Sequence, residues 1–290
     1  MRIVSLVPSA SEIICDLGLK NSLVAVSHEC NYPISLNQLP AITSSSINSS
    51  LPQIEVDNLV RAKVAENKPL YKINDQLLND LAPNTIITQG VCDVCAISES
   101  QVEATLKGQL CTLSIETEII SLNGRTFDGI CKDIETLGKK LNKEKEASLI
   151  IDNAKAEKEI MLSEKKSDIR VLCLEWLDPY FSAGHWVPEQ IEMAGFVSAI
   201  GNPGDQSRVL TVNEIIESNP DVIAVICCGY NKKENEVFAN KLFKDKGLSH
   251  LNPIKQNQVF YFDSDQYFSR PTLRIVEGAK QLREKILTNI

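Results

Sequence analysis

The sequence predicts an α/β protein with two lobes, mainly parallel sheets, one long connecting helix and a ligand cleft between the lobes. Three observations support this fold class. Apolar runs of strand length alternate with helical patterns on both sides of residues 143–165. Residues 143–165 contain no Gly or Pro and carry apolar residues at helical spacing. The Pro-polar turn and strand pattern of residues 81–87 is repeated at 218–224, which indicates two Rossmann-like halves.

An N-terminal α/β lobe is predicted over residues 1–125. It begins with an apolar run of strand length at residues 2–7. Ser9 with Glu12 fits a capping box that opens a helix, and Gly18 would end that helix. Residues 41–50 are Ser-rich and are expected to be irregular. The same alternation predicts further strands at 23–26, 85–88 and 111–114 and helices at 54–66, 74–81 and 99–106.

Connecting helices are predicted over residues 126–166. A helical stripe of apolar residues comes first, and the helix at 143–165 follows; at about 1.5 Å per residue it would span about 30 Å. A surface helix of a single domain is the alternative reading. The stripe consists of Phe127, Ile130, Ile134, Leu137 and Leu141.

A C-terminal α/β lobe is predicted over residues 167–290. A loop rich in aromatic residues and Gly is expected at 175–188, and Ser269 is the candidate cap of the last helix. The predicted strands are 169–174, 221–227 and 258–262, and the predicted helices are 189–194, 212–218, 232–244 and 271–287.

Composition narrows the classes of function. The chain has 290 residues, 43% of them hydrophobic, and a net charge of −8. This charge argues against nucleic acid or an anionic membrane as partner, and no apolar run reaches the roughly 20 residues of a membrane span. The first strand follows almost directly on Met1 and is too short for a signal peptide, so the protein is expected in the cytoplasm. A monomer is also expected. The nine cysteines would then be thiols or metal ligands.

Two loops of the N-terminal lobe carry metal-ligand chemistry. Cys92 and Cys95 have the two-residue spacer that lets two thiolates reach one metal, and packing of small thiols is the alternative. His28, Glu29 and Cys30 follow the second strand. Because ligands lie at the carboxyl ends of parallel strands, these loops are expected to be close, and Cys92, Cys95, His28 and Cys30 form a candidate metal site. The alternative is that His28 only hydrogen-bonds its loop.

A second cluster lies in the C-terminal lobe. Both tryptophans of the chain, Trp176 and Trp186, occur here, with Glu175 and His185 beside them. Indole faces would suit a flat, wide ligand with polar edges, and burial of the tryptophans in the core is the alternative. No phosphate loop and no G-x-S-x-G elbow is present. Four further candidates for ligand binding lie at strand ends: Pro8, Ser9, Gln89 and Tyr230.

These residues carry a family resemblance over most of the chain. The chain resembles the class III substrate-binding proteins of ABC importers, which bind corrinoids and siderophores, and in particular the vitamin B12-binding proteins. Within them it is similar to a branch without a signal peptide, through residues 27–33 (SHECNYP), Cys92-x-x-Cys95 and residues 175–179 (EWLDP). The wider resemblance rests on residues 2–9 (RIVSLVPS) with Glu12, Gly18 and Leu19, on residues 81–87 (LAPNTII), on the helix at 143–165, and on Ser269-Arg270-Pro271.

The resemblance implies two lobes joined by one long helix, with a small-molecule ligand between them. It also implies docking to a permease through one surface Glu on each lobe. The C-lobe position falls on Glu192, whereas the N-lobe position falls on Gln76, so one docking carboxylate is replaced. Docking to a permease is therefore doubtful for this chain.

The leading hypothesis is a protein that binds a corrinoid, such as cobalamin, or a related metal-chelate ligand, and it is not expected to be an enzyme. Trp176 and Trp186 would flank the ligand plane, and His28, Cys30, Cys92, Cys95 or His185 would coordinate its metal or hydrogen-bond its edge. One alternative is a cytosolic Zn- or Fe-binding protein, or a metal-dependent enzyme that uses Glu29, Glu175 and His185. A second alternative is an ABC importer solute receptor whose leader is absent from the sequence.

Overall fold

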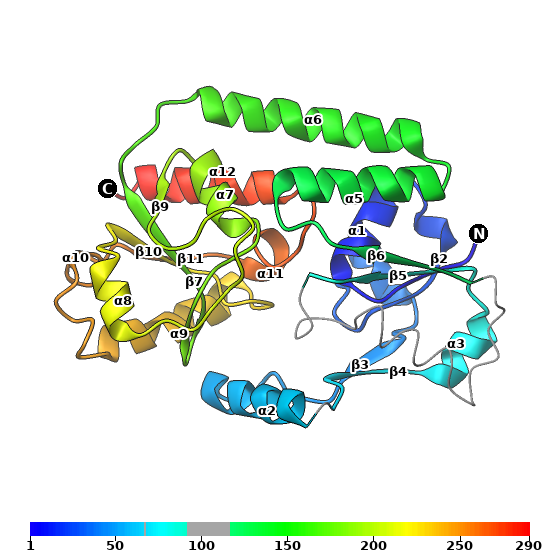
Figure 1. Ribbon diagram of the computed structural model, residues 1–290, viewed down its shortest axis with the longest axis horizontal. Coiled ribbons are helices and arrows are strands. Elements are labelled where there is room, and N and C mark those ends of the chain that lie inside the picture. The colour runs from blue at the N-terminus through cyan, green and yellow to red at the C-terminus, as the bar shows by residue number, and fades with distance from the viewer. Residues whose placement is uncertain (67, 92–116) are drawn as a thin grey trace. The chain divides into compact units, whose positions relative to one another are not determined.

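A computed structural model describes residues 1–66, 68–91 and 117–290 (Figure 1). The helix predicted at 99–106, the strand predicted at 111–114, and Cys92 and Cys95 lie outside these residues. The described residues form two compact units. Unit 1 comprises Met1–Gly124 and Gly129–Ile150, and unit 2 comprises Arg125–Asp128 and Ile151–Ile290. The expected division into 1–125, 126–166 and 167–290 stays a prediction.

Unit 1 is built on a four-stranded parallel sheet. Its strands are rich in β-branched residues and are buried on both faces, as parallel sheets require. One side of the sheet packs a core that includes Val4, Ala25 and Ile86. The last strand, β6, was not predicted. The order across the sheet is β2 (Leu23–Val26), β1 (Ile3–Ser5), β5 (Thr85–Gln89) and β6 (Glu118–Leu122).

The helices of unit 1 begin in different ways. In α3, the Asn74 side chain accepts a hydrogen bond from Leu77 N and caps the helix. The capping box predicted at Ser9 is wrong, because α1 begins directly after Val7 with Pro8 in its first turn. Ser9 and Glu12 are instead buried within the helix. The helices are α1 (Pro8–Asp16), α2 (Gln53–Ala65), α3 (Asp75–Leu81) and α5 (Phe127–Lys140), with 3₁₀ turns at Lys20–Ser22 and Ile34–Gln38.

A small antiparallel ribbon also belongs to unit 1. Its strands, β3 (Thr43–Ser45) and β4 (Tyr71–Ile73), bracket α2 in the chain. The Ser-rich stretch at 41–50 is therefore not irregular throughout. Only Gln53 of the thirteen α2 residues is buried, and α2 carries three exposed large apolar side chains: Ile54, Leu59 and Val64.

Unit 2 contains a five-stranded mixed sheet. The loop predicted over 175–188 is wrong in its first half, because β7 continues to Leu177 and a tight turn returns the chain antiparallel as β8. The other pairings of the sheet are parallel. The order is β11 (Val259–Tyr261), β10 (Val222–Val225), β7 (Arg170–Leu177) and β8 (Tyr180–Ser182), and β9 (Val197–Ser198) also pairs with β7.

Helices pack on this sheet, and two of them start with a full capping box. Ser269 is not the cap of the last helix, which begins at Ile275; its hydroxyl accepts a hydrogen bond from Gly229 N instead. The helices are α7 (Val187–Met193), α8 (Val212–Glu217), α9 (Lys232–Lys244), α10 (Asn252–Lys255), α11 (Ser264–Tyr267) and α12 (Ile275–Leu287).

Two helices contribute to both units: α5, whose first two residues belong to unit 2, and α6. The long helix predicted at 143–165 is α6 (Glu144–Ser163), and a boundary between the units falls after Ile150, inside it (Figure 1). Its buried side chains include Ala147, Ile151 and Met161. The expected α/β fold with parallel sheets and a long connecting helix is thus confirmed. Of the helices in the described ranges, none is both long enough and apolar enough to cross a membrane.

Candidate ligand-binding site

In unit 1, several predicted residues lie where the parallel strands end. Val4 pairs with Ala25 and Ile86, so β1, β2 and β5 run in register and their carboxyl ends meet at one edge of the sheet. Pro8, His28 and Gln89 come at or just after these ends. This edge is where ligands of parallel α/β sheets lie.

Cys30 sits beneath this edge rather than on it. Its side chain is only 6% exposed, and Sγ lies 3.0 Å from Ser11 Oγ, which donates to Ser5 Oγ at 2.8 Å. A small side chain enclosed in this way is typical of a cysteine that packs as a hydrophobic residue. This placement favours packing for Cys30.

His28 is held by side chains of its own edge. Its Nδ1 lies 2.7 Å from Thr43 Oγ1, and that hydroxyl donates to Ser27 Oγ at 3.1 Å. The ring centroid is 5.9 Å from that of Tyr71, and burial of the ring lowers the pKa of His28. With Nδ1 engaged in a neutral ring, Nε2 is the nitrogen that remains to contact a ligand. Thr43 was missed in the sequence, because it lies on the unpredicted strand β3.

In unit 2, an aromatic pair marks the carboxyl ends of β7 and β10. The ring centroids of Trp176 and Tyr230 are 5.9 Å apart, and both side chains are half-buried. Trp176 Nε1 donates to Asp178 O at 3.1 Å, so its polar group is already satisfied. Tyr230 packs its ring edge against Phe238 at 4.8 Å. Burial, with Cys227 nearby, raises the pKa of Tyr230 to about 12, so its hydroxyl is protonated at neutral pH.

The second tryptophan has a different setting. Trp186 is 6% exposed, and its Nε1 donates to Phe268 O at 2.9 Å. An indole that is enclosed and hydrogen-bonded in this way packs the interior. This favours the core-packing alternative for Trp186, whereas Trp176 stays accessible. His185, next to it, is half-buried. Glu175, at the end of β7, accepts a backbone hydrogen bond from Cys228 N at 3.0 Å.

The predicted metal site stays a prediction. Cys92 and Cys95 lie outside the described residues. Within the ranges that the structure describes, no three His, Cys, Asp or Glu side chains are grouped so that they could hold a metal ion. Glu29 is exposed on the loop after β2.

The two positions considered for permease docking are both at the surface. Glu192 is exposed on α7. Gln76 is exposed on α3, and its Nε2 donates to Asp80 Oδ1 at 2.8 Å. A carboxylate therefore lies beside Gln76, one helical turn along α3. Docking through these positions stays a prediction.

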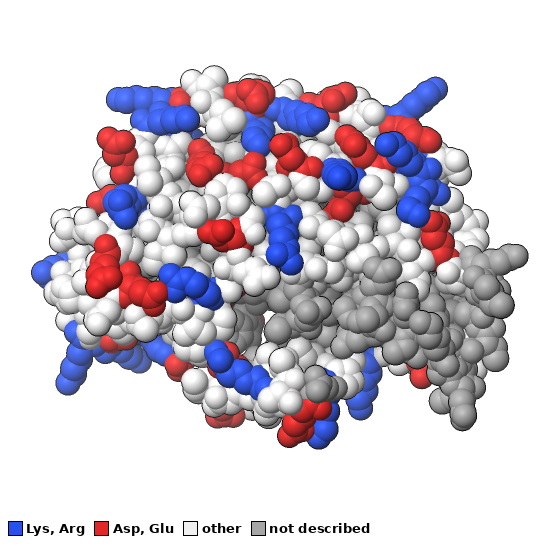
Figure 2. Space-filling view, viewed as in Figure 1, with Lys and Arg blue, Asp and Glu red and all other residues white. Residues whose placement is uncertain are grey.

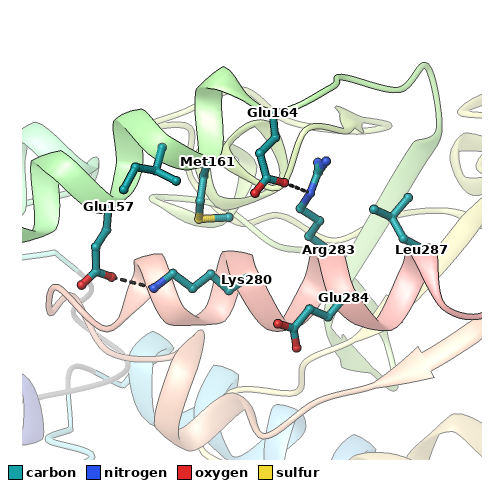
Figure 3. A pocket seen from close by; sticks show the side chains of 8 residues that line it. Glu157, Met161, Glu164, Lys280, Arg283, Glu284 and Leu287 are labelled. Carbon is teal, nitrogen blue, oxygen red and sulfur yellow. Dashed lines mark hydrogen bonds and ion pairs between the residues drawn. The ribbon is translucent and has the colours of Figure 1, made fainter.

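A groove of about 320 Å³ lies elsewhere in unit 2, between α6 and α12 (Figure 3). Two ion pairs cross it: Lys280 Nζ to Glu157 at 2.7 Å and Arg283 Nε to Glu164 at 2.5 Å. Its volume is at the lower end for small-molecule sites, and helices rather than strand ends line it. The strand ends therefore stay the candidate ligand site.

Surface charge agrees with a small-molecule ligand. On the face that Figure 2 displays, Lys and Arg side chains are interspersed with Asp and Glu side chains and do not gather into a basic patch. The net charge of −8 likewise argues against nucleic acid or an anionic membrane as the partner.

The sequence profile of the periplasmic binding proteins matches residues 93–266, which is more than half of the chain. The chain belongs to the periplasmic binding protein family. The chain is also similar to the uncharacterized ABC transporter substrate-binding lipoprotein YvrC of Bacillus subtilis (strain 168). It is 24% identical over 293 residues, which span 98% of this chain and 79% of the relative.

Solved structures share the fold of this periplasmic binding protein. The heme-binding protein RhuT of Roseiflexus sp. RS-1 matches with a TM-score of 0.72 and 19% identity, over 99% of this chain and 98% of its own. The vitamin B12-binding protein BtuF of Vibrio cholerae matches with a TM-score of 0.66 and 18% identity, over 99% and 97%. At these identities the likeness concerns the fold.

Proposed function

We propose that this periplasmic binding protein binds a corrinoid or a related metal-chelate ligand at the carboxyl ends of its parallel strands. The observation that carries the proposal is the Trp176–Tyr230 pair. Because the indole N–H is already bonded to Asp178 O, Trp176 offers a ligand its apolar face rather than its polar edge. A flat macrocycle is the ligand that such a face suits.

The comparisons support the same class of ligand. RhuT is named for heme and BtuF for vitamin B12, and both ligands are metal-bearing tetrapyrrole-type macrocycles. At the strand ends of unit 1, His28 provides a neutral imidazole. Neutral imidazole is a ligand that transition metals accept.

Calorimetric titration with cyanocobalamin and with hemin tests the proposal. We expect one of the two to bind, and we expect Trp176→Ala to weaken that binding about tenfold, or about 1.4 kcal/mol, through lost stacking. Phe243→Ala is the control, because it removes an aromatic ring from the exposed side of α9, where it is 42% exposed. No heat of binding with either compound at several hundred micromolar would overturn the proposal.

The alternative of a zinc or iron protein has no supporting observation among the described residues. Elemental analysis of protein purified without a His-tag distinguishes it. Stoichiometric zinc or iron that disappears in Cys92→Ser would favour that alternative over the macrocycle.

A further inference from the structure

His185 of unit 2 has a buried ring nitrogen, Nδ1, that makes no hydrogen bond to the described residues. It lies between β8 and α7 with a backbone φ of +56°, in the left-handed region that side chains other than Gly rarely adopt. Two backbone hydrogen bonds hold it there. His185 N donates to Asp205 O at 2.6 Å, and Gly204 N donates to His185 O at 2.8 Å. Unusual backbone of this kind persists only where the surroundings impose it.

The residues on both sides of His185 are closely packed. A β-carbon on Gly184 would lie 2.4 Å from Ser207 N, so the chain approaches the 204–207 segment as closely as glycine allows. On the other side, Trp186 is anchored by its bond to Phe268 O, and the imidazole centroid lies 5.7 Å from the indole. The backbone that carries the imidazole is therefore held in place.

The state of the ring follows from its surroundings. Burial lowers the pKa of His185, and the positive charge of Arg125 lowers it further, so the imidazole is neutral at neutral pH. Nδ1 is buried and has no hydrogen-bond partner among the described residues. A buried N–H without an acceptor is rarer in proteins than an acceptor without a donor. The single proton of the neutral ring therefore belongs on Nε2.

The Nε2–H tautomer distinguishes between two roles for His185, metal ligand and hydrogen-bond donor. A histidine that ligates a metal through Nε2 needs its proton on Nδ1 and almost always donates that N–H to a partner. His185 has no such partner among the described residues, so it is not arranged as an axial ligand. It is arranged as an N–H donor toward an acceptor.

Arg125 supplies a positive charge at the same place. The segment that carries it packs on the His185 loop: a β-carbon on Gly204 would lie 3.6 Å from Thr126 Cγ2. Phe127 N also donates to Glu189 Oε2 at 2.7 Å, which ties the segment to α7. A neutral N–H donor beside a guanidinium favours an anionic oxygen over a neutral one.

We propose that His185 and Arg125 form a subsite that binds a carboxylate of the ligand, His185 through Nε2–H and Arg125 through its guanidinium. The ligand class is then a carboxylate-bearing tetrapyrrole rather than one whose edge is entirely amide. This inference rests on the proposed function, because it assigns the edge contacts of the same macrocycle.

Titration with hemin and with hemin dimethyl ester, which has the same ring and metal but no free carboxylate, tests the subsite. We expect the native protein to bind hemin at least about tenfold more tightly than the ester. In His185→Asn and in Arg125→Gln that ratio should fall toward one. Asn is chosen because it tolerates the left-handed backbone. Lys255→Gln, which removes an exposed charge on α10, is the control and should keep the native ratio.

Equal binding of hemin and its ester to the native protein would overturn the subsite and leave the proposed function standing. Absence of binding by hemin, its ester and cyanocobalamin would overturn both. A measurement on the ligand-free protein is independent of either result. Imidazole ¹⁵N shifts, assigned by the signal lost in His185→Asn, should report the Nε2–H tautomer at neutral pH, and an Nδ1–H tautomer would refute the subsite directly.

Discussion

At the scale of single residues, one close approach holds α7 and α12 together. Gln190, fully buried on α7, donates its side-chain amide to Tyr267 O at 3.0 Å and to Ile275 O at 2.9 Å. Gly278 of α12 lies against this bridge. A β-carbon there would be 2.5 Å from Gln190 Nε2 and 2.6 Å from Tyr267 O. The absence of a side chain at Gly278 is therefore what allows the bridge to form.

Gly278→Ala tests this close approach through the sign of the change in the free energy of unfolding. Alanine in a helix interior is intrinsically better than glycine by roughly 0.5–1 kcal/mol. We nevertheless expect a net loss of about 1–3 kcal/mol in the free energy of unfolding, because a backbone carbonyl cannot move aside as a side chain can. Urea denaturation measures it, and a variant more stable than the native protein would show that the contact is not tight.

At the scale of elements, helix starts show where local sequence signals suffice. Two helices of unit 2 begin with reciprocal capping boxes, Thr211 with Glu214 and Asn231 with Glu234. The same residue pattern at Ser9 and Glu12 does not form a box, because α1 already begins at Pro8 and Ser9 lies inside the helix. A capping motif thus predicts the start of a helix only when no residue before the motif starts the helix earlier.

The Glu214 carboxylate of α8 makes stability depend on pH in a defined direction. A hydrogen bond from Thr211 N, then one from the Arg208 side chain, lower the pKa of Glu214 to about 2 from an ordinary 4.5. A lowered pKa in the folded state means that the stabilisation is present above pH 4.5 and is lost as the pH falls toward 2. We expect Glu214→Gln to be less stable than the native protein at pH 7 and equally stable near pH 2.

Urea midpoints at pH 7, 4 and 2.5 check this expectation. Glu217→Gln, at the other end of α8, is the control for the loss of one carboxylate. A native-to-variant difference at Glu214 that stayed constant over this range would show that the capping box does not form.

The strands show what the sequence could not provide. Strand β2 was predicted with its observed bounds, because its apolar run ends in a polar loop. Strands β6 and β8 were missed, since their extended backbone depends on pairing with β5 and β7 rather than on a local pattern. The strand-end positions of Trp176 and His28 could be predicted, because they follow apolar runs. Burial of Trp186 was only an alternative in the sequence, and the contact of His28 with Thr43 could not be predicted, because both depend on tertiary packing.

At the scale of the whole molecule, the chain has two compact units, each with its own parallel or mixed sheet. Unit boundaries fall inside α5 and inside α6, so each of these helices is a single run of helical hydrogen bonds that belongs to both units. Both tryptophans lie in unit 2, whereas helices occur in both units. Fluorescence therefore reports unfolding of unit 2, and far-UV circular dichroism reports both units.

A matched pair of core truncations tests whether the units unfold separately. Ile86 of unit 1 is 1% exposed and Ile223 of unit 2 is 0% exposed, and truncation of either to Ala should cost about 2–5 kcal/mol. We expect Ile223→Ala to lower the fluorescence midpoint in urea. Ile86→Ala should lower the dichroism midpoint and leave the fluorescence midpoint nearly unchanged. Equal shifts of both signals in both variants would mean that the chain unfolds as one cooperative body.

Helix α2 has a consequence for how the folded chain opens. Most helices in water owe their persistence to a face packed against a core, yet only Gln53 of α2 is buried. Its local opening therefore needs little free energy, and its backbone amides should exchange with deuterium well before those of the sheets. A protease that recognises basic residues would accordingly cut at Arg61 or Lys63 before it cuts within the two sheets.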